Sequence, residues 1–441
     1  MIREFLFKPV SSIPLSLWRI LFGIVLIVEC FGSILVGYTH LLFITPPVAS
    51  FNFIGFDWMN CSPGYHLYGI YIVMGLLAVG ITLGWKYRWM MSLFTVLWWW
   101  TYLMHKVSYN NHHYLMGLIC ILMTISPAVV NLSLDSRKGS AKRTNSIPGI
   151  YHYQFVALLF IVYTYAAMAK LYPDWLHGVL IEEWFKPKHD FPVIGGFYRW
   201  AYTKYLVAWG GIAFDFLVIP ALIYKPTRNA AFVIGIFFHV TNSITFQIGT
   251  FPYMMIASAV FFYPESVLTK RFRLKPNLSS TTRPTGNTRL ILIFYSLFFL
   301  LQIALPLRHH LIPGDVLWTE EGHRLSWRMM LRSKSGYIRF TIVDQDGNRT
   351  FHDHQADLSE HQAGMLPTHP DLIWQYCQRL KRIYGDEAEI YVRSRVSLNY
   401  REAQDMIDPT YNMAKASWHP FRRSEWVLDG PDRSFSSRQR F

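Results

Sequence analysis

The sequence predicts a polytopic all-α membrane domain of about nine transmembrane helices, followed by a small α+β domain on the outer face of the membrane. Three observations predict this class. Long apolar runs recur over the first 300 residues. Of the 441 residues, 52% are hydrophobic and only 16% are charged, against roughly 25% charged in ordinary soluble domains. The basic residues gather in short loops between the apolar runs, which is typical of multi-pass membrane proteins.

The net charge of +14 is divided unevenly along the chain. Residues 1–307 hold 23 Lys+Arg and 10 Asp+Glu, a net of +13, whereas residues 308–441 hold 19 and 18, a net of +1. Because the excess follows the apolar part, it indicates membrane orientation and not a nucleic-acid partner. We therefore expect two domains, a transmembrane domain at 1–307 and a soluble domain at 308–441.

Nine apolar runs are candidates to cross the roughly 30 Å hydrocarbon layer as helices. The seventh and eighth are shorter than the rest and also fit one re-entrant pair. The runs lie near residues 16–37, 65–84, 88–104, 112–131, 153–171, 204–224, 229–246, 250–264 and 289–307.

The loops between these runs predict an orientation. If the spans alternate, one set of loops carries 16 basic residues and the opposite set carries five, which are Lys106, Lys186, Lys188, Arg199 and Lys204. The positive-inside rule then places the N-terminus and the basic loops in the cytoplasm. Lys106 and the soluble domain are expected together on the outer, periplasmic or lumenal face.

The last 134 residues have the pattern of a small α+β domain. Tyr337–Val343 and Glu389–Leu398 alternate apolar and polar side chains, as half-buried strands do. Asp346 and Gly347 form a hairpin signal before a second short strand at Thr350–His352. Asp371–Tyr384 has apolar side chains at helical spacing and is followed by a glycine stop.

Several polar residues lie inside the predicted spans, where ionisable groups cost several kcal/mol and are usually paired or functional. Arg19 and Glu29 fall in the first span, and Arg19 either snorkels to the cytoplasmic interface or serves a site. Asp215 falls in the sixth span. His239 and Asn242 fall one helical turn apart in the seventh. These last three fit either a buried interhelical hydrogen-bond network or a cofactor pocket.

The richest polar stretch is HKVSYNNHHY, residues 105–114, at the outer ends of the third and fourth spans. Burial disfavours the charged form of a lysine and lowers its pKa, which suits Lys106 to act as a general base. The alternative is an interfacial polar belt with a snorkelling lysine. The histidines lack HxxxH or HExxH spacing, and the four cysteines form no CxxC pair, so we predict no metal site.

The same stretch carries a family resemblance. HKVSYNNHHYL resembles the DK-x-S-(W/Y)-NNH-x-YL motif of the vitamin K-dependent gamma-carboxylases, and the N-terminal part is similar to the transmembrane domain of their horizontally spread bacterial relatives. Other stretches resemble further family motifs in the family's order. They are WRILFG at 18–23, AMAKLYPDWLHG at 167–178, GGIAFD at 210–215, FHVTNSITFQIGTFPYMMIAS at 238–258, LSWRMMLRSKS at 325–335, VSLNYREAQDMIDP at 396–409 and HPFRRSEWV at 419–427.

This resemblance implies a membrane enzyme that uses vitamin K hydroquinone, O2 and CO2. Oxygenation of the hydroquinone to its epoxide generates a strong base, which removes a γ-proton from a protein glutamate, and the carbanion adds CO2 to give γ-carboxyglutamate. The γ-C–H bond is far too weakly acidic for any side chain, so the base must be made in a dry pocket. The implied partners are a glutamate-containing protein or peptide, the lipid bilayer and a vitamin K quinone reductase.

The resemblance also implies roles for individual residues. Lys106 matches the lysine proposed to deprotonate the hydroquinone. The residues that match positions near the cofactor are Asn110, Asn111, His112, His239 and Asn242. The stretch implicated in holding the glutamate is matched by Ser326, Trp327, Met329 and Met330.

The sequence departs from the family pattern at two places. The family's Asp before the lysine is His105 here, and its aromatic positions before Ser326 are His323, Arg324 and Leu325. The length, shorter than that of the animal enzymes, predicts a bacterial member in the inner membrane. The altered residues keep open a quinone epoxidase or other quinone oxidoreductase without carboxylation. The polytopic architecture keeps open a non-enzymatic membrane binder or transporter.

Overall fold

A computed structural model describes residues 2–44, 50–59, 64–141, 144–274 and 287–431. Lys142, Arg143, Lys275 and Arg283, four of the sixteen basic residues assigned to cytoplasmic loops, lie outside these ranges. The chain forms two compact units. Unit 1 comprises residues 1–45, 52–161 and 217–301, and unit 2 comprises residues 46–51, 162–216 and 302–441. The boundary predicted at residue 307 stays a prediction.

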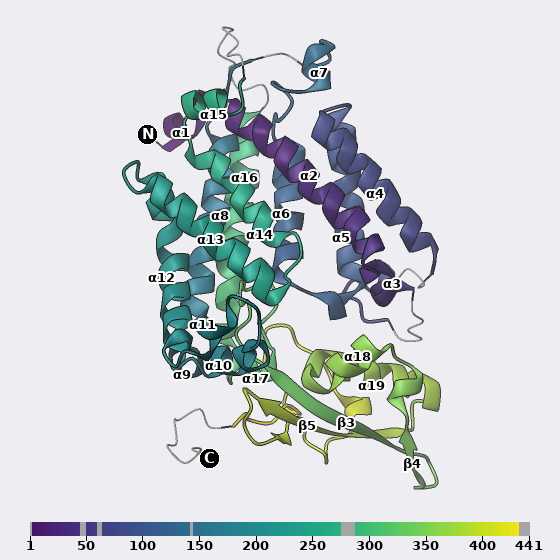
Figure 1. Ribbon diagram of the computed structural model, residues 1–441. Coiled ribbons are helices and arrows are strands. Elements are labelled where there is room, and N and C mark those ends of the chain that lie inside the picture. The colour runs from purple at the N-terminus through teal and green to yellow at the C-terminus, as the bar shows by residue number, and fades with distance from the viewer. Residues whose placement is uncertain (1, 45–49, 60–63, 142–143, 275–286, 432–441) are drawn as a thin grey trace. The chain divides into compact units, whose positions relative to one another are not determined.

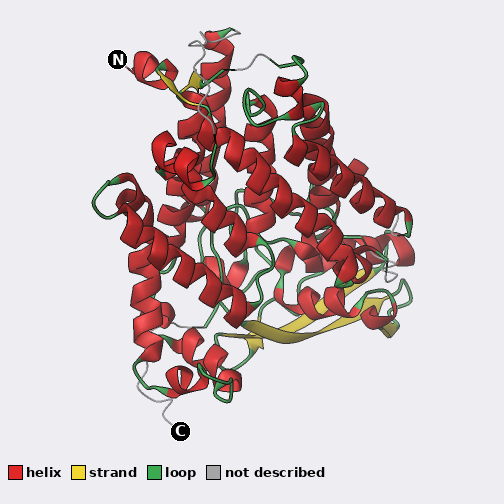
Figure 2. Cartoon of the chain, turned by 45° about the horizontal axis from the view of Figure 1, so that its top comes forward, coloured by secondary structure: helices red, strands yellow, loops and turns green. Residues whose placement is uncertain are grey.

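Helices make up most of the chain, and strands form only short segments (Figure 2). Residues of α8 (Ile150–Ala169), α12 (Thr203–Ile223) and α16 (Thr288–Leu307) are divided between the two units. The other α-helices of unit 1, labelled in Figure 1, are α1 Ile2–Phe7, α2 Ile13–Leu35, α3 Tyr38–Phe43, α4 His66–Leu83, α5 Tyr87–Met104, α6 Asn111–Ile125, α7 Leu134–Arg137, α13 Arg228–Phe246, α14 Phe251–Ala257 and α15 Glu265–Arg271. Two short strands, β1 Pro9–Ser11 and β2 Ser146–Pro148, pair with each other.

Six helices within the described ranges are long and apolar enough to cross a membrane: α2, α4, α8, α12, α13 and α16. They coincide with six of the nine predicted spans, so the count of nine is not confirmed. The runs at 112–131 and 250–264 form shorter apolar helices. The run at 88–104 forms α5, which is rich in tryptophan and tyrosine and is not among these six helices.

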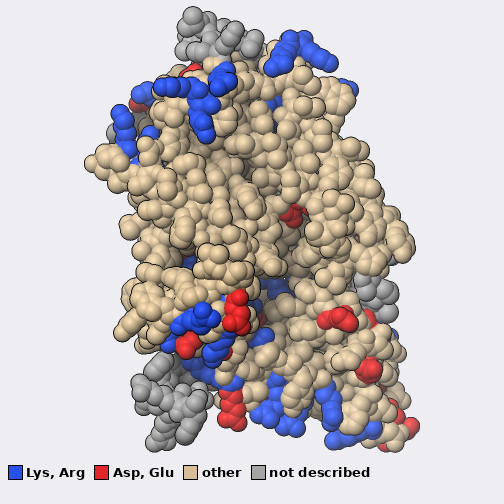
Figure 3. Space-filling model, in the orientation of Figure 1, with Lys and Arg blue, Asp and Glu red and all other residues tan. Residues whose placement is uncertain are grey.

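The surface of unit 1 separates apolar from basic side chains. Its long helices present an almost uncharged face, and Lys and Arg gather at the end where α1, α7 and α15 lie (Figures 1 and 3). This separation is what a helical bundle needs if its middle contacts hydrocarbon and its end contacts water.

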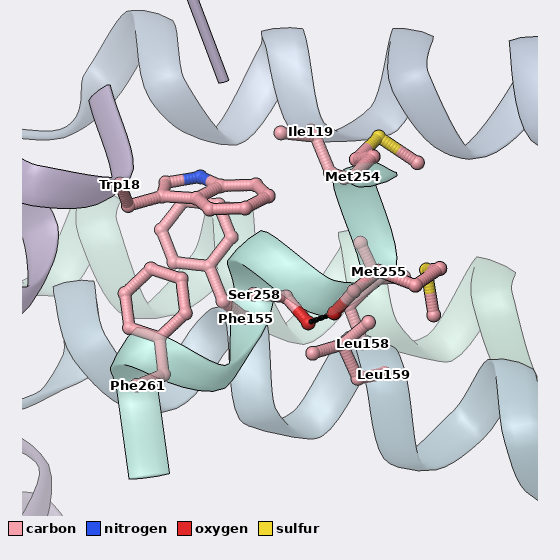
Figure 4. A pocket seen from close by; sticks show the side chains of 9 residues that line it. All are labelled: Trp18, Ile119, Phe155, Leu158, Leu159, Met254, Met255, Ser258 and Phe261. Carbon is pink, nitrogen blue, oxygen red and sulfur yellow. Dashed lines mark hydrogen bonds between the residues drawn. The ribbon is translucent and has the colours of Figure 1, made fainter. Parts of the chain in front are cut away.

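Aromatic rings fill the core between α2, α8 and the 3-10 helix at Ser258–Phe262. Phe155 stacks on Phe261 with ring centroids 4.7 Å apart, and Trp18 lies 5.5 Å from Phe261. These three rings line a small cavity with Met254, Met255 and aliphatic side chains (Figure 4). Because this wall is apolar, the cavity provides packing and hydrophobic burial rather than a polar site.

Arg19 is fully buried near the beginning of α2, so it does not snorkel to solvent. Its Nη2 donates to the carbonyl of Leu132 at 2.6 Å. Gly84 ends α4 with φ +64°, and a Cβ added there would lie 1.7 Å from Nη1 of Arg19. The glycine is therefore required twice, for its left-handed backbone and for the space that the guanidinium occupies.

Unit 2 contains an antiparallel sheet with strand order β4-β3-β5-β6. Its strands are β3 Lys334–Val343, β4 Arg349–His352, β5 Glu389–Leu398 and β6 Gln404–Asp405. Its helices are α9 Pro173–Leu176, α10 Val179–Phe185, α11 Gly195–Arg199, α17 Val316–Thr319, α18 Glu360–Met365 and α19 Pro370–Tyr384. In Figure 1, α18 and α19 cover one face of the sheet. The predicted hairpin, the helix near 371–384 and the strand at 389–398 are confirmed.

A buried ion pair within unit 2 joins two stretches that lie far apart in the sequence. Asp174 of α9 has no exposed surface. Its carboxylate accepts hydrogen bonds from both terminal nitrogens of Arg401, at 2.6 and 2.7 Å, and from Nδ2 of Asn399 at 2.6 Å. A bidentate pair of this kind fixes the mutual orientation of the two segments.

We predict that Gly84→Ala strongly destabilises unit 1, because it adds a collision with Arg19 to the cost of a left-handed alanine. The matched control is Gly139→Ala, where φ is +76° and, apart from its chain neighbours, no atom of the described residues lies within 4 Å of the added Cβ. The control should cost only the backbone penalty of roughly 1–2 kcal/mol, and Gly84→Ala a further 1–3 kcal/mol or so for overpacking. Thermal unfolding of the detergent-purified variants measures the difference. Equal losses in the two variants would contradict the packing argument.

Candidate functional site

The turn between α5 and α6 carries the residues singled out in the sequence. Lys106 begins a 3-10 turn, Lys106–Ser108, and only 2% of its surface is exposed. Nδ1 of His105 lies 3.0 Å from Oγ of Ser108, and that hydroxyl donates to the carbonyl of His105 at 2.9 Å. The turn therefore holds the side chain of Lys106 in a buried position.

The turn continues into α6 through two asparagines. Asn110 is the N-cap, since its Oδ1 accepts the backbone N–H of His113 at 2.7 Å. Asn111 is buried, and its Oδ1 accepts from the hydroxyl of Tyr109 at 2.9 Å. The sequence NNHH thus begins a helix whose first turn presents two imidazoles.

The two imidazoles make different contacts. The ring of His112 lies 5.1 Å from the ring of Phe251, and His239 of α13 lies 6.2 Å from the same ring. The structure thus brings together two of the predicted cofactor residues, His112 and His239, through an aromatic side chain of α14. Asn242 lies three residues after His239 on α13 and is half-buried.

His113 points to a carboxylate of the first span. Its Nε2 lies 2.9 Å from Oε1 of Glu29, and Oε2 of Glu29 accepts from the hydroxyl of Thr250 at 2.5 Å. Nδ1 of His113 lies 2.9 Å from Nδ2 of Asn110. A pocket beside this pair is lined by Ser108 and by residues of α2 to α5, namely Ser33, Tyr38, Leu42, Phe43, Tyr71, Trp98, Thr101 and Tyr102.

Unit 2 holds a second buried pair of opposite charges. Nζ of Lys170, just after α8, forms an ion pair with Asp215 of α12, and both side chains are largely buried. The same ammonium lies 5.5 Å from the ring of Trp175, whose indole N–H donates to the carbonyl of Ala208. Asp215 is therefore a member of an interhelical polar network.

The predicted glutamate-binding stretch is a turn of unit 2 between α17 and β3. Ser326 and Trp327 are buried, Met329 is half-buried and Met330 is 41% exposed. Oγ of Ser326 donates to the carbonyl of Gly322 at 2.6 Å. Trp327 and Met330 adopt left-handed φ values of +55° and +50°. Such conformations are costly for non-glycine residues and concentrate at functional sites.

The turn is held by a buried cluster of charges. Glu320 accepts from Nε and Nη2 of Arg332, at 2.5 and 2.6 Å, and from Nζ of Lys334 at 3.1 Å. Burial alone would raise the pKa of the Glu320 carboxyl, but these two cations hold it well below its usual range. Burial lowers the pKa of His323, and it lowers the pKa of His369 from 6.5 to about 3. Both imidazoles are therefore neutral beside the ion pair.

Within the described ranges, no group of three or more His, Cys, Asp and Glu side chains is arranged to hold a metal ion.

Three of these interactions were not predicted. Glu29 was noted as a charge inside the first span, but its partners His113 and Thr250 were not identified. His113 stands three residues after Asn110, the spacing of an N-cap contact, which is a signal present in the sequence. Lys170 belongs to the AMAKLYPDWLHG stretch. No spacing rule connects it to Asp215, 45 residues later.

Lowering the pH from 7 to 5 should destabilise unit 2 through His369. Because burial lowers the pKa of His369, the unfolded chain binds its proton first, and stability falls as the pH drops from about 6.5 toward about 3. The loss is at most about 1.4 kcal/mol per pH unit for this group. Thermal unfolding at both pH values should show a smaller pH effect in His369→Gln. Equal acid sensitivity in the two proteins would refute the assignment.

Two family models match the chain and together cover nearly all of it. Residues 7–266 match the HTTM domain, and residues 287–433 match the lumenal domain of vitamin K-dependent gamma-carboxylase. No solved structure matches this chain. The first match spans more than half of the 441 residues, and the apolar helices agree with it. The chain is a multi-pass membrane protein that belongs to the vitamin K-dependent gamma-carboxylase family.

Proposed function

We propose that this protein is a vitamin K-dependent gamma-glutamyl carboxylase, which couples oxygenation of vitamin K hydroquinone to its epoxide with carboxylation of protein glutamate. The observation that carries the proposal is the buried cluster of amine, imidazole and amide groups at residues 105–113 in a chain with both family domains. Family membership supports an enzyme of the carboxylase type that acts on glutamate-containing substrates.

The polar residues of unit 1 fit an aromatic diol. Such a ligand needs hydrogen-bonding groups for its hydroxyls and aromatic surfaces for its rings. His112, His239 and the ring of Phe251 supply both, and Asn110, Asn111 and Asn242 complete the proposed cofactor-binding set. Reduced vitamin K, when bound there, would supply together with O2 the strong base that removes the glutamate γ-proton before CO2 adds.

The protein's own part is to accept the proton of the hydroquinone and to keep water away. We propose Lys106 as the catalytic base, because its side chain is almost fully buried and the turn that carries it is ordered. Lys170 is a second candidate, favoured by its ion pair with Asp215 in a largely buried setting. A carboxylate beside an amine can orient it and take part in proton exchange.

We propose that Ser326, Trp327, Met329 and Met330 hold the glutamate substrate. Three features support this: the family match of this segment, the left-handed turn and the partly exposed methionines. Three arginines, Arg324, Arg328 and Arg332, place positive charge at this turn. Arg324 pairs with Asp371, and Arg332 pairs with Glu320. An acidic peptide is the ligand that such a surface attracts.

We further propose a transmembrane domain at 1–307 and a soluble domain at 308–441, with the N-terminus in the cytoplasm. The uneven distribution of basic residues supports this orientation, as does their gathering at the α1, α7 and α15 end of unit 1 (Figure 3). In a bacterial inner membrane the soluble domain would face the periplasm. A quinone reductase that regenerates the hydroquinone would be the metabolic partner.

A quinone epoxidase without carboxylation is the second candidate function. It is favoured by His323, which replaces a family aromatic residue and is buried against the Glu320 cluster, so that only 6% of its surface is exposed to a substrate. A non-enzymatic quinone binder or transporter is the third, supported only by the polytopic architecture.

We predict that Lys106→Ala lowers both epoxide formation and carboxylation by at least about 100-fold, because general-base catalysis contributes roughly that much. Purified protein with reduced vitamin K, labelled bicarbonate and a glutamate peptide provides both measurements. Lys138→Ala is the matched control, since Lys138 is an exposed lysine of the same unit. A fully active Lys106→Ala enzyme would exclude Lys106, and Lys170→Ala then tests the second base.

The two products also separate the three functions. Labelled carboxyglutamate together with epoxide supports the carboxylase. Epoxide without carboxylation across varied glutamate peptides supports the epoxidase. Quinone binding without oxygen consumption supports the binder, and it would overturn both enzymatic assignments.

A further inference from the structure

We propose that Glu29 is a positioning residue that aligns the His112–Phe251–His239 cluster through a single tautomer of His113. The proposal deepens the proposed function, on which its kinetic test rests. The two carboxylate oxygens of Glu29 contact side chains of two separate segments. Oε1 contacts His113 of α6, and Oε2 contacts Thr250 just before α14.

The direction of the Asn110 side chain determines the protonation of His113. Oδ1 of Asn110 accepts the backbone N–H of His113 at 2.7 Å, so Nδ2 faces Nδ1 of His113 at 2.9 Å. Because an amide nitrogen only donates, Nδ1 must accept, and the imidazole carries its hydrogen on Nε2. That hydrogen is donated to Glu29. If Nδ1 of His113 also carried a hydrogen, its N–H would face the N–H of Asn110 Nδ2, and two donors would meet without an acceptor.

The ring of His113 is held on its other sides as well. Trp98 of α5 packs edge-on against it with centroids 5.6 Å apart, and the indole N–H of Trp98 donates to the carbonyl of His113 at 3.2 Å. The imidazole therefore has one place and one orientation, and its Nε2–H points to α2.

This anchoring determines where His112 lies. Consecutive residues of an α-helix differ by about 100° around the axis, so fixing His113 against α2 also fixes the direction of His112. On the other side, Glu29 holds Thr250, the residue before Phe251. One carboxylate thus sets both partners of the His112–Phe251 contact, and His239 packs against the same ring.

Burying the charge of Glu29 in an apolar span costs free energy that an apolar side chain would avoid. A carboxylate inside an apolar span is expensive unless hydrogen-bonded, and an apolar residue at this position would pack α2 without that cost. A carboxylate is justified here because it accepts from two donors on different segments at once.

The test compares Glu29→Ala with Glu29→Gln. Glutamine keeps an acceptor for His113 and a polar group for Thr250, whereas alanine removes both. We expect Glu29→Ala to raise KM for reduced vitamin K or lower kcat for epoxide formation by about 10- to 100-fold, as misplaced groups do, with KM for the glutamate peptide unchanged. Glu29→Gln should regain most of the activity. Val28→Ala is the matched control, since Val28 is an exposed neighbour on the same helix.

A spectroscopic arm does not depend on activity. Nitrogen-15 NMR of histidine-labelled protein, with the His113 signal assigned by its loss in His113→Gln, should show a neutral ring protonated at Nε2. In Glu29→Ala that preference should weaken. A doubly protonated or Nδ1-protonated His113 in the wild type would overturn the proposal.

The kinetic outcomes are equally decisive. Normal epoxide kinetics in Glu29→Ala would refute the positioning role. A Glu29→Gln enzyme as impaired as Glu29→Ala would also overturn the proposal, because glutamine keeps the acceptor for His113 on which the alignment depends. Wild-type protein that forms no epoxide would instead contradict the proposed function and leave the NMR arm to decide on Glu29.

Discussion

The structure depends on the rule that a charge removed from water must find a partner. In an apolar bundle, an unpaired ion costs several kcal/mol, so each buried charge constrains the segments around it. Glu29 binds His113 and Thr250, Lys170 binds Asp215, and Asp174 binds Arg401. Each of these interactions joins stretches between 45 and 227 residues apart.

The buried polar residues differ in the kind of contact that they make. The bidentate pairs Asp174–Arg401 and Glu320–Arg332 have both members fully engaged, so they serve the architecture of unit 2. The imidazoles at 112 and 239 instead pack against the ring of Phe251.

The segment proposed to bind the glutamate substrate is constrained by the conformation of its turn. The turn carrying Ser326–Met330 contains left-handed non-glycine residues and is held by the Glu320 cluster beneath it. A strained turn persists only where its surroundings over-determine it. Here the surroundings are two ion pairs and two neutral histidines.

The sequence by itself determined the class of protein, because hydropathy, charge asymmetry and alternation depend only on residue order. It predicted six of the membrane-length helices, the Asp346-Gly347 hairpin, the helix near 371–384 and the family. The count of nine spans is not confirmed, because within the described residues α5 is rich in Trp and Tyr, and the apolar helices at Asn111–Ile125 and Phe251–Phe262 are shorter than the six long ones. The tertiary structure alone decided which polar groups meet. Glu29 and His113 are 84 residues apart, and no local pattern encodes a hydrogen bond that exists only after helices pack.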